Sequence, residues 1–418
     1  MPLRIVATKP NPALVTLPWH IPLEKWTDEY VVPLPRGISR HVVRIVRLGT
    51  DVYAVKETRE PIAFREYRML RDLRRLDLPA VEPVAVVAGR ESEDGEEVEP
   101  ALVTRHLTYS LPYRSLFSHG LRADSLPKLI DALAVLLVRL HLAGFFWGDV
   151  SLSNVLFRRS AGEFTAYLVD AETGELHSEL SRGQRAHDLE VAYGNLFGEL
   201  LDLQAGGLVD EEVDPHAIVE LVEKRYTALW DELTGIEEFD TTEMWRIEQR
   251  VERLNELGFD VDELDIVTDW SGSTVRLQPK VVEAGHHSRD LQSLTGLDVE
   301  DNQARRLLND LAAFTAHYDL GGEDRALVAN RWLTTIYDPI LAMVPRELRG
   351  KLEPAEVFHE ILEHRWFLSE QAGHEIDLFE TARDYIDTVL SKRPNEVVTD
   401  ADNPDVLMPP TRSWPGTS

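Results

Sequence analysis

The chain contains no cysteine and no long apolar run. With no cysteine among 418 residues, disulfides and thiolate metal sites are excluded, which suits a protein of a reducing compartment. No apolar stretch approaches the roughly 18 residues that a membrane-spanning helix needs, and the first ten residues lack the apolar core of a signal peptide. We therefore expect a cytoplasmic protein without a transmembrane segment.

Positive charge is also scarce. The 44 Lys and Arg residues are outnumbered by 73 Asp and Glu residues, which gives a formal net charge of −29. Such a surface repels nucleic-acid backbones and anionic lipids, so we expect no nucleic-acid partner. Only 8 of the 44 basic residues are lysine, and Lys56 is the single lysine between Lys25 and Lys128. Its isolation makes Lys56 a candidate for a specific role.

Composition and hydrophobic pattern divide the chain into five parts. They are an N-terminal extension with several prolines (1–30), a mostly β lobe with one helix (31–107), a more helical lobe (108–234), a mainly helical C-terminal domain (235–392) and a disordered tail (393–418). The C-terminal domain offers enough surface for a protein partner. A chain of this length has room for two or three such domains.

Alternating and helical apolar patterns predict the individual elements. In the first half we expect a hairpin of strands 41–48 and 51–56, a helix 61–76, strands 81–88 and 101–107, a helix 126–143, strands 154–157 and 164–169, and helices 186–203 and 215–233. In the second half we expect a helix 242–257, strands 264–268 and 273–282, and helices 302–318, 324–342, 354–371 and 375–391.

Five polar residues follow one another along the first half in a meaningful order. They are Lys56, Glu66, Asp149, Asn154 and Asp170. This is the minimal set of side chains that holds ATP and Mg²⁺ and transfers a γ-phosphoryl group. The order, with strands before it and helices after it, predicts an α+β fold: a two-lobed protein-kinase-like fold followed by a mainly helical α+β C-terminal domain.

Lys56 and Glu66 are expected to form an ion pair. On its helix, Glu66 shares the apolar stripe with Ile62, Met69 and Leu70. A buried carboxylate needs a cation, and Lys56 on the preceding strand is the natural one. The pair would direct the ammonium toward the α and β phosphates. The alternative is an amphipathic helix with a glutamate at the edge of its stripe.

Asp149 and Asn154 stand five residues apart, after a long apolar helix and directly before an apolar strand. We expect Asp149 to act on the acceptor hydroxyl and the Asn154 amide oxygen to bind Mg²⁺. Asp170 follows another strand, where its carboxylate would bridge the metal to the β and γ phosphates. Glu172 is close enough to assist as a metal ligand, or is a solvated turn residue.

The remaining candidates support this site. Asp188 precedes apolar residues on one helix face, so it is either a helix N-cap or a buried anchor for the catalytic-loop backbone. The expected phosphate-binding loop contains a single glycine between the first two strands, where a glycine-rich loop has three. Backbone amides near Gly37 and Ser39 would cover the phosphates.

With these residues in place, the chain resembles the bacterial lipopolysaccharide-kinase group of the protein-kinase-like superfamily. The match rests on Arg65-Glu66-Tyr67, Gly148-Asp149 with Asn154, and Leu168-Val-Asp170, and it covers roughly residues 30–207. Residues beyond it resemble an uncharacterised C-terminal domain attached to such kinases. The resemblance implies ATP, Mg²⁺ and a sugar or lipid-linked hydroxyl acceptor. Trp147, in place of a histidine, and Asp170-Ala-Glu172, in place of Asp-Phe-Gly, depart from the pattern.

Three functions compete at this point. The first is a kinase acting on a small-molecule or glycan-like hydroxyl, and the second is a protein kinase. The short segment from Asp170 to Asp188 argues against the second, because it leaves little room for an activation and peptide-docking segment. The third is a nucleotide-binding pseudokinase or scaffold that works through its C-terminal domain, which the thin glycine loop and Trp147 favour.

Overall fold

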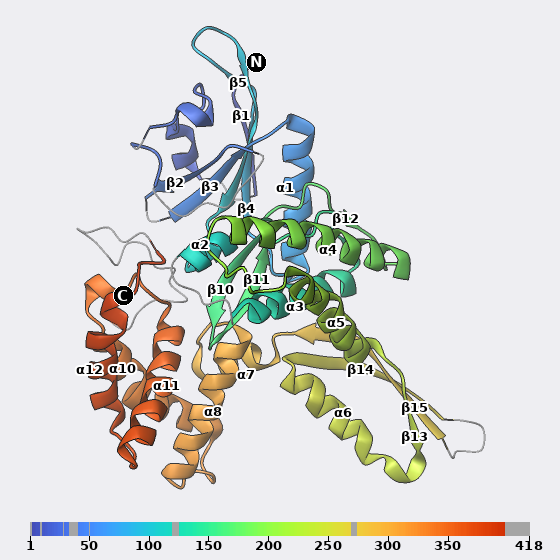
Figure 1. The fold of residues 1–418 in the computed structure, drawn as a ribbon, viewed down its shortest axis with the longest axis vertical. Helices are drawn as coiled ribbons and strands as arrows, with labels where there is room; N and C mark the ends of the chain where they lie inside the picture. Colours follow the sequence, from blue (N-terminus) through green and yellow to red (C-terminus); the bar gives the residue numbers. More distant parts are fainter. Residues whose placement is uncertain are drawn as a thin grey trace. The chain divides into compact units, whose positions relative to one another are not determined.

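The computed structural model describes residues 2–8, 11–27, 29–32, 41–49, 51–118, 125–268 and 274–397. It divides into two compact units (Figure 1). The first contains Met1–Arg158 and Phe164–Glu223, and the second contains Arg159–Glu163 and Lys224–Arg393. The predicted loop residues Gly37 and Ser39, and nearly all of the predicted tail, lie outside the described residues.

An antiparallel sheet in the order β1-β4-β7-β3-β2 forms the small lobe of the first unit. Its strands are β1 (Arg4–Ala7), β2 (Val43–Leu48), β3 (Asp51–Glu57), β4 (Pro83–Ala88) and β7 (Ala101–Arg105). The helix α1 (Glu60–Arg75) packs on this sheet through an apolar face that includes Tyr67, Leu70 and Leu73. The predicted hairpin and helix are confirmed, and the register aligns Lys56 with Val43 and Leu102.

The first 30 residues are not an extension, so that prediction is wrong. β1 pairs with β4, and residues such as Leu14 and Trp19 are buried in the core of the small lobe. Buried Arg90 donates to the Trp19 carbonyl at 2.9 Å and to Glu57 Oε1 at 2.6 Å. The prolines suggested irregular structure, but Pro12 opens a 3-10 helix (Pro12–Thr16), where a missing N–H costs nothing.

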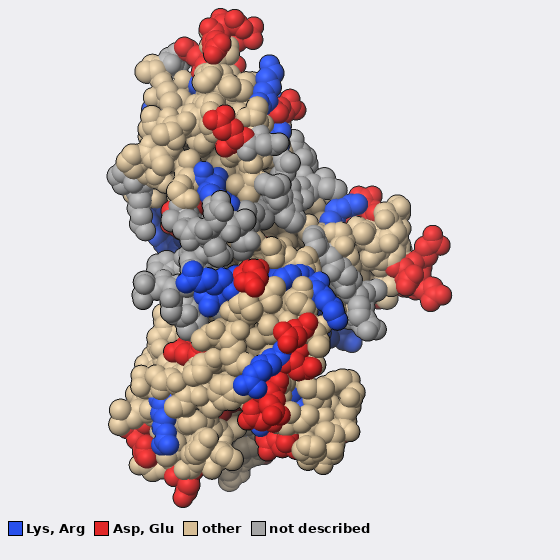
Figure 2. All heavy atoms as spheres, turned by 90° about the vertical axis from the view of Figure 1, so that its left-hand side faces the viewer, with Lys and Arg blue, Asp and Glu red and all other residues tan. Residues whose placement is uncertain are grey.

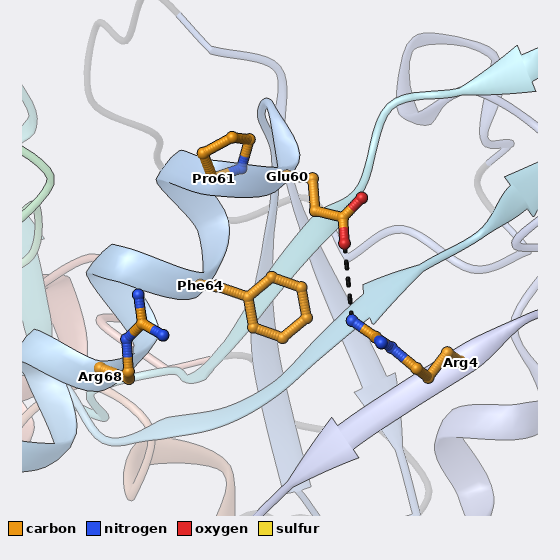
Figure 3. Close-up of a pocket in the computed structure, with 5 residues that line it drawn as sticks. All are labelled: Arg4, Glu60, Pro61, Phe64 and Arg68. Carbon is orange, nitrogen blue, oxygen red and sulfur yellow. Dashed lines mark hydrogen bonds and ion pairs between the residues drawn. The ribbon is translucent and has the colours of Figure 1, made fainter.

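A second contact ties β1 to α1. Arg4 Nη2 lies 3.5 Å from Glu60 Oε1, and its guanidinium stands over the ring of Phe64, 5.2 Å from the centroid. Figure 3 shows these side chains lining an open pocket together with Pro61 and Arg68. None of the predicted site residues lines this pocket, so we assign it a structural role within the small lobe.

The large lobe of the first unit is mostly helical. Its helices are α2 (Tyr113–Ser118), α3 (Leu126–Leu142), α4 (Arg182–Ala205) and the first part of α5 (Pro215–Thr234), and its short strands are β8 (Ser110–Pro112), β9 (Phe145–Phe146), β10 (Val155–Ser160), β11 (Glu163–Leu168) and β12 (Glu175–Leu176). β10 and β11 form a sheet with β8. The turn between β10 and β11 has Ala161 at φ 53° and Gly162 at φ 78°.

The second unit combines a three-stranded sheet with a helical core. The sheet, in the order β13-β15-β14, consists of β13 (Glu237–Asp240), β14 (Phe259–Thr268) and β15 (Thr274–Ala284). The helices are α6 (Trp245–Glu256), α7 (His286–Thr295), α8 (Asp301–His317), α9 (Arg325–Trp332), α10 (Asp338–Ala342), α11 (Pro354–Ala372) and α12 (Leu378–Thr388). Helices α7 to α12 supply most of one hydrophobic core. Helix α7 was not predicted from the sequence.

The second unit begins earlier than the predicted boundary at residue 235. The end of α5 is bound to α6, because Arg253 Nε lies 3.2 Å from Glu232 Oε1, and to β15, because Gln278 donates to the Thr234 carbonyl at 3.1 Å. The unit also includes the β10–β11 turn, whose Ala161 N–H donates to buried Glu356 at 2.8 Å. These bonds join residues far apart in sequence, which a pattern of apolar residues does not reveal.

The acidic composition is visible on the surface. Figure 2 shows acidic side chains gathered at the upper end of the small lobe, where β5 (Arg90–Glu91) and β6 (Glu97–Val98) form a hairpin that carries exposed Glu93, Asp94 and Glu96. Such a hairpin repels phosphate backbones. In the described part of the chain, no helix combines the length and apolarity needed to span a membrane.

Candidate active site

Lys56 lies at the centre of a cluster of three carboxylates. Its Nζ is 3.0 Å from Glu66 Oε2, 2.6 Å from Asp170 Oδ2 and 3.2 Å from Glu172 Oε2. The Lys56 side chain is 12% exposed and that of Glu66 only 1%, so these charges interact with little screening by water. The structure therefore brings together four residues that the sequence singled out from three separate segments.

The excess of acidic groups in this cluster shifts the pKa values of Lys56 and Glu66. Burial opposes the positive charge on Lys56, but the carboxylates of Glu66 and Asp170 outweigh burial and raise the pKa of the ammonium. Burial and, after it, the Asp170 charge raise the pKa of Glu66 to about 8, although Lys56 opposes this shift. Three carboxyl groups surround one ammonium, and His41 Nε2 lies 3.2 Å from Glu172 Oε2.

Asp170 and Glu172 follow the end of β11, which brings their carboxylates to Lys56. Leu168, at the end of β11, exchanges backbone hydrogen bonds with the segment that links α1 to β4, because its N–H donates to the Pro79 carbonyl at 2.8 Å and its carbonyl accepts from Val81. Asp170 follows two residues later, and its Oδ1 accepts the Glu172 N–H at 3.1 Å. The Asn154 carbonyl accepts the Val169 N–H at 3.0 Å, so Asn154 and Asp170 stand at adjoining strand ends.

Asp149 and Asn154 contact each other within the catalytic loop. Asn154 Nδ2 donates to the Asp149 carbonyl at 3.0 Å and to Asp149 Oδ2 at 3.1 Å. These donations turn the nitrogen of the Asn154 amide toward Asp149 and leave its oxygen for another partner, such as a metal. The carboxylate of Asp149 is partly exposed, which an acceptor hydroxyl requires.

Asp188 holds the start of this loop from the helix α4. It is fully buried; Oδ2 accepts the Trp147 N–H at 2.9 Å and Oδ1 accepts the Gly148 N–H at 2.7 Å. His141 Nε2 lies 3.0 Å from the same carboxylate. The N-cap alternative for Asp188 is wrong, because α4 begins at Arg182 with Ser181 as its cap. The geometry is that of an anchor for the loop backbone.

Trp147 and Gly148 show how the departure from the family pattern is accommodated. Trp147 is fully buried, and its carbonyl accepts the Thr173 hydroxyl at 2.8 Å. Gly148 has φ 78°, a left-handed conformation that side chains disfavour. The tryptophan therefore fills the core beneath the loop and leaves the backbone contacts to Asp188 intact.

Two residues that the sequence analysis missed complete the loop. Glu199 on α4 accepts the N–H groups of Leu152 and Ser153 at 2.9 and 2.8 Å, and Asn195 on α4 contacts Asp149 itself. A signal was present, since Asn195 and Glu199 follow Asp188 by seven and eleven residues. At about 100° per residue these positions share one face of a helix.

The donor set of the Lys56 cluster fits a magnesium ion. Glu66, Asp170 and Glu172 offer oxygens that all lie within 4.8 Å of one another, and within the described residues no other His, Asp and Glu group meets this criterion. Carboxylate oxygens are the ligands that Mg²⁺ prefers. Glu66 Oε1 is buried and has no hydrogen-bond partner in the described part of the chain, which is costly unless a cation approaches.

Comparisons with known proteins identify the family of the first half of the chain. The model described as the lipopolysaccharide kinase (Kdo/WaaP) family matches residues 41–196, which include the Lys56 cluster, Asp149, Asn154, Asp188 and Asn195 but not Glu199. Two relatives from strains of Xanthomonas oryzae pv. oryzae, each named 3-deoxy-D-manno-octulosonic acid kinase, are 30% identical over 180 residues, covering 41% of this chain and 68% of theirs. The chain belongs to the lipopolysaccharide kinase (Kdo/WaaP) family. Its membership confirms the resemblance inferred from the motifs and supports a kinase activity.

The second half matches a different model. Residues 228–390 match a domain of unknown function, DUF4032, which confirms the expected uncharacterised domain behind the kinase. Among solved structures, one titled "WaaP in complex with acyl carrier protein" is similar with a TM-score of 0.32 and 17% identity, covering 53% of this chain and 99% of that one. The helices and sheets of the structure confirm the predicted α+β class with a mainly helical second part, and the family match identifies the first part as kinase-like.

The raised pKa of Glu66 predicts a pH dependence of stability. Because the folded state binds this proton more tightly than the unfolded chain, whose glutamates titrate near 4.5, the contribution of Glu66 to stability is largest below 4.5 and falls as pH rises toward about 8. Glu66→Gln should remove that fall. Thermal unfolding of the apo protein between pH 5 and 8 should show the midpoint of the variant gaining on the parent as pH rises.

Glu190→Gln is the matched control, because Glu190 is an exposed glutamate on α4. It should track the parent at every pH. Parallel curves for the parent and Glu66→Gln would contradict the assignment of a raised pKa to Glu66.

Proposed function

We propose that the protein is an ATP-dependent phosphotransferase that moves the γ-phosphoryl group to a hydroxyl of a sugar or glycolipid-like acceptor. One observation carries the proposal: the Lys56 ammonium lies within 3.2 Å of three carboxylates, Glu66, Asp170 and Glu172, beside a loop that presents Asp149. Family membership agrees with it.

Each residue takes one role in this proposal. Lys56, oriented by Glu66, binds the α and β phosphates, while Asp170, Asn154 and Glu172 are the residues that would hold Mg²⁺. Bound there, the ion would neutralise charge on the phosphate oxygens. As the oxygen of the acceptor hydroxyl bonds to the γ-phosphorus, Asp149 accepts the proton of that hydroxyl. The bond from that phosphorus to the β–γ bridging oxygen breaks, and ADP leaves with the bond electrons.

Two observations support a small acceptor: the short segment between Asp170 and α4, and the name of the relatives. Between Asp170 and the start of α4 at Arg182 lies one two-residue strand, β12. A segment this short offers little surface for a peptide. The relatives' name points to 3-deoxy-D-manno-octulosonic acid as the first acceptor to test. Gly37 and Ser39 remain the proposed cover of the phosphates.

The test is transfer from γ-labelled ATP, with Mg²⁺, to a panel of acceptors. The panel contains 3-deoxy-D-manno-octulosonic acid, neutral hexoses and an unfolded protein substrate, and the products are identified by mass spectrometry. Label on a sugar, abolished in Lys56→Met, is the expected result. Label on the protein would favour a protein kinase. ATP binding without transfer to any acceptor would favour the pseudokinase that the sequence left open.

A further inference from the structure

Asn195 links the catalytic carboxylate to a rigid helix. Its Nδ2 donates to Asp149 Oδ1 at 3.2 Å and to the Val150 carbonyl at 3.0 Å. One carboxamide therefore binds both the Asp149 side chain and the backbone of the loop. The other carboxylate oxygen, Oδ2, accepts from Asn154 at 3.1 Å, so two amides hold the two oxygens of Asp149.

The helix gives Asn195 a fixed position. α4 runs from Arg182 to Ala205, and its buried residues include Ala192 and Leu196 on either side of Asn195. Along the same face, Asp188 holds the start of the loop and Glu199 holds its later backbone. Asn195 lies between these anchors and donates to the Asp149 carboxylate.

Asn195 differs from Asp188 and Glu199 in the groups that it binds. Asp188 and Glu199 satisfy buried backbone N–H groups, which stabilises the loop whatever the loop does. Asn195 instead donates to the Asp149 carboxylate and, together with Asn154, fixes its orientation. A carboxylate has about four lone-pair sites, so Asp149 keeps capacity for the acceptor hydroxyl while both amides are bound.

We propose that Asn195 is a positioning residue that holds the Asp149 carboxylate in the orientation that receives the acceptor hydroxyl. The inference rests on the proposed phosphotransferase function and adds a residue that the five-residue motif does not contain. Small displacements of a reacting group lower the catalytic rate strongly. Losing the hydrogen bond from Asn195 to Asp149 should therefore lower turnover while leaving nucleotide binding intact.

Three substitutions test the proposal in the full-length protein. Asn195→Asp keeps the shape but removes both N–H donors, Asn195→Ala removes the group, and Asn195→Gln restores an amide on a longer stem. A hydrogen bond to a charged group is worth enough to predict a fall in kcat of about 10- to 100-fold for the first two. We expect the KM for ATP to stay within about twofold, with partial recovery of kcat in Asn195→Gln.

Gly194→Ala is the control on the neighbouring position of α4. A Cβ at Gly194 meets no heavy atom within 4 Å, so this variant should keep the parent's kcat and thermal stability. Parent-like kcat in both Asn195→Asp and Asn195→Ala would overturn the proposal. So would equal losses of kcat and thermal stability without recovery in Asn195→Gln, because these indicate a structural role.

The outcome can be separated from that of the proposed function. If the parent transfers no phosphoryl group to any acceptor, the phosphotransferase fails, and a crystal structure of Asn195→Ala still decides the placement of Asp149. A rotated or multiply positioned carboxylate would support the inference. An Asp149 side chain unchanged from the parent would overturn it.

Discussion

Replacing Asp149 by asparagine should slow phosphoryl transfer by about 10²- to 10⁴-fold, the usual scale for losing a general base, while nucleotide affinity stays nearly intact. In the proposed mechanism the Asp149 carboxylate acts on the acceptor rather than on ATP. Asn154 should stay in place, because its Nδ2 also donates to the backbone carbonyl of residue 149, which the substitution retains. Steady-state kinetics and calorimetric titration with ATP measure the two quantities separately.

Asp202→Asn on the exposed face of α4 is the matched control and should behave as the parent. A large loss of ATP affinity in Asp149→Asn would show that Asp149 belongs to the nucleotide site. Unchanged transfer would remove it from the mechanism, and full complementation of a deletion strain by this variant would favour the pseudokinase.

Replacing Asp170 by asparagine should abolish most of the stabilisation that Mg²⁺ adds to ATP binding. A ligand at 100 times its Kd stabilises the folded protein by about 2.7 kcal/mol, and each kcal/mol raises the midpoint of a domain of this size by about 2–4 °C. The neutral amide is a poorer magnesium ligand than the carboxylate. Thermal unfolding with ATP, in Mg²⁺ or in EDTA, isolates the metal-dependent part of the shift.

Glu175→Gln controls for the removal of an acidic group nearby, because Glu175 is exposed and lies near Arg65 and His177 rather than in the Lys56 cluster. It should keep the magnesium-dependent shift. If Asp170→Asn keeps it as well, Asp170 is not the metal ligand and the assignment of Glu172 and Asn154 to the same ion loses its support.

The small lobe shows what the sequence could predict. Alternation of apolar residues located β2, β3 and β4, and the stripe containing Glu66 and Leu70 located α1, because local periodicity follows directly from which face is buried. The pairing of Lys56 with Glu66 followed from the cost of a buried carboxylate. Neither step needed information from distant parts of the chain.

The missed features depend on contacts between distant segments. Arg90 binds the Trp19 carbonyl across 71 positions, and this contact helps to make the first 30 residues part of the small lobe's core. Asn195 meets Asp149 across 46 positions. His41, just before β2, meets Glu172 from far away in sequence. A single sequence predicts that a polar residue lies on a helix face, but it does not identify the segment that the face meets.

The most direct measurement is a crystal structure with Mg²⁺ and a non-hydrolysable ATP analogue. The account predicts Lys56 on the α and β phosphates while still paired with Glu66, and the ion on Asp170 and Asn154. A nucleotide bound elsewhere, or a Lys56 side chain turned to solvent in that complex, would contradict the account.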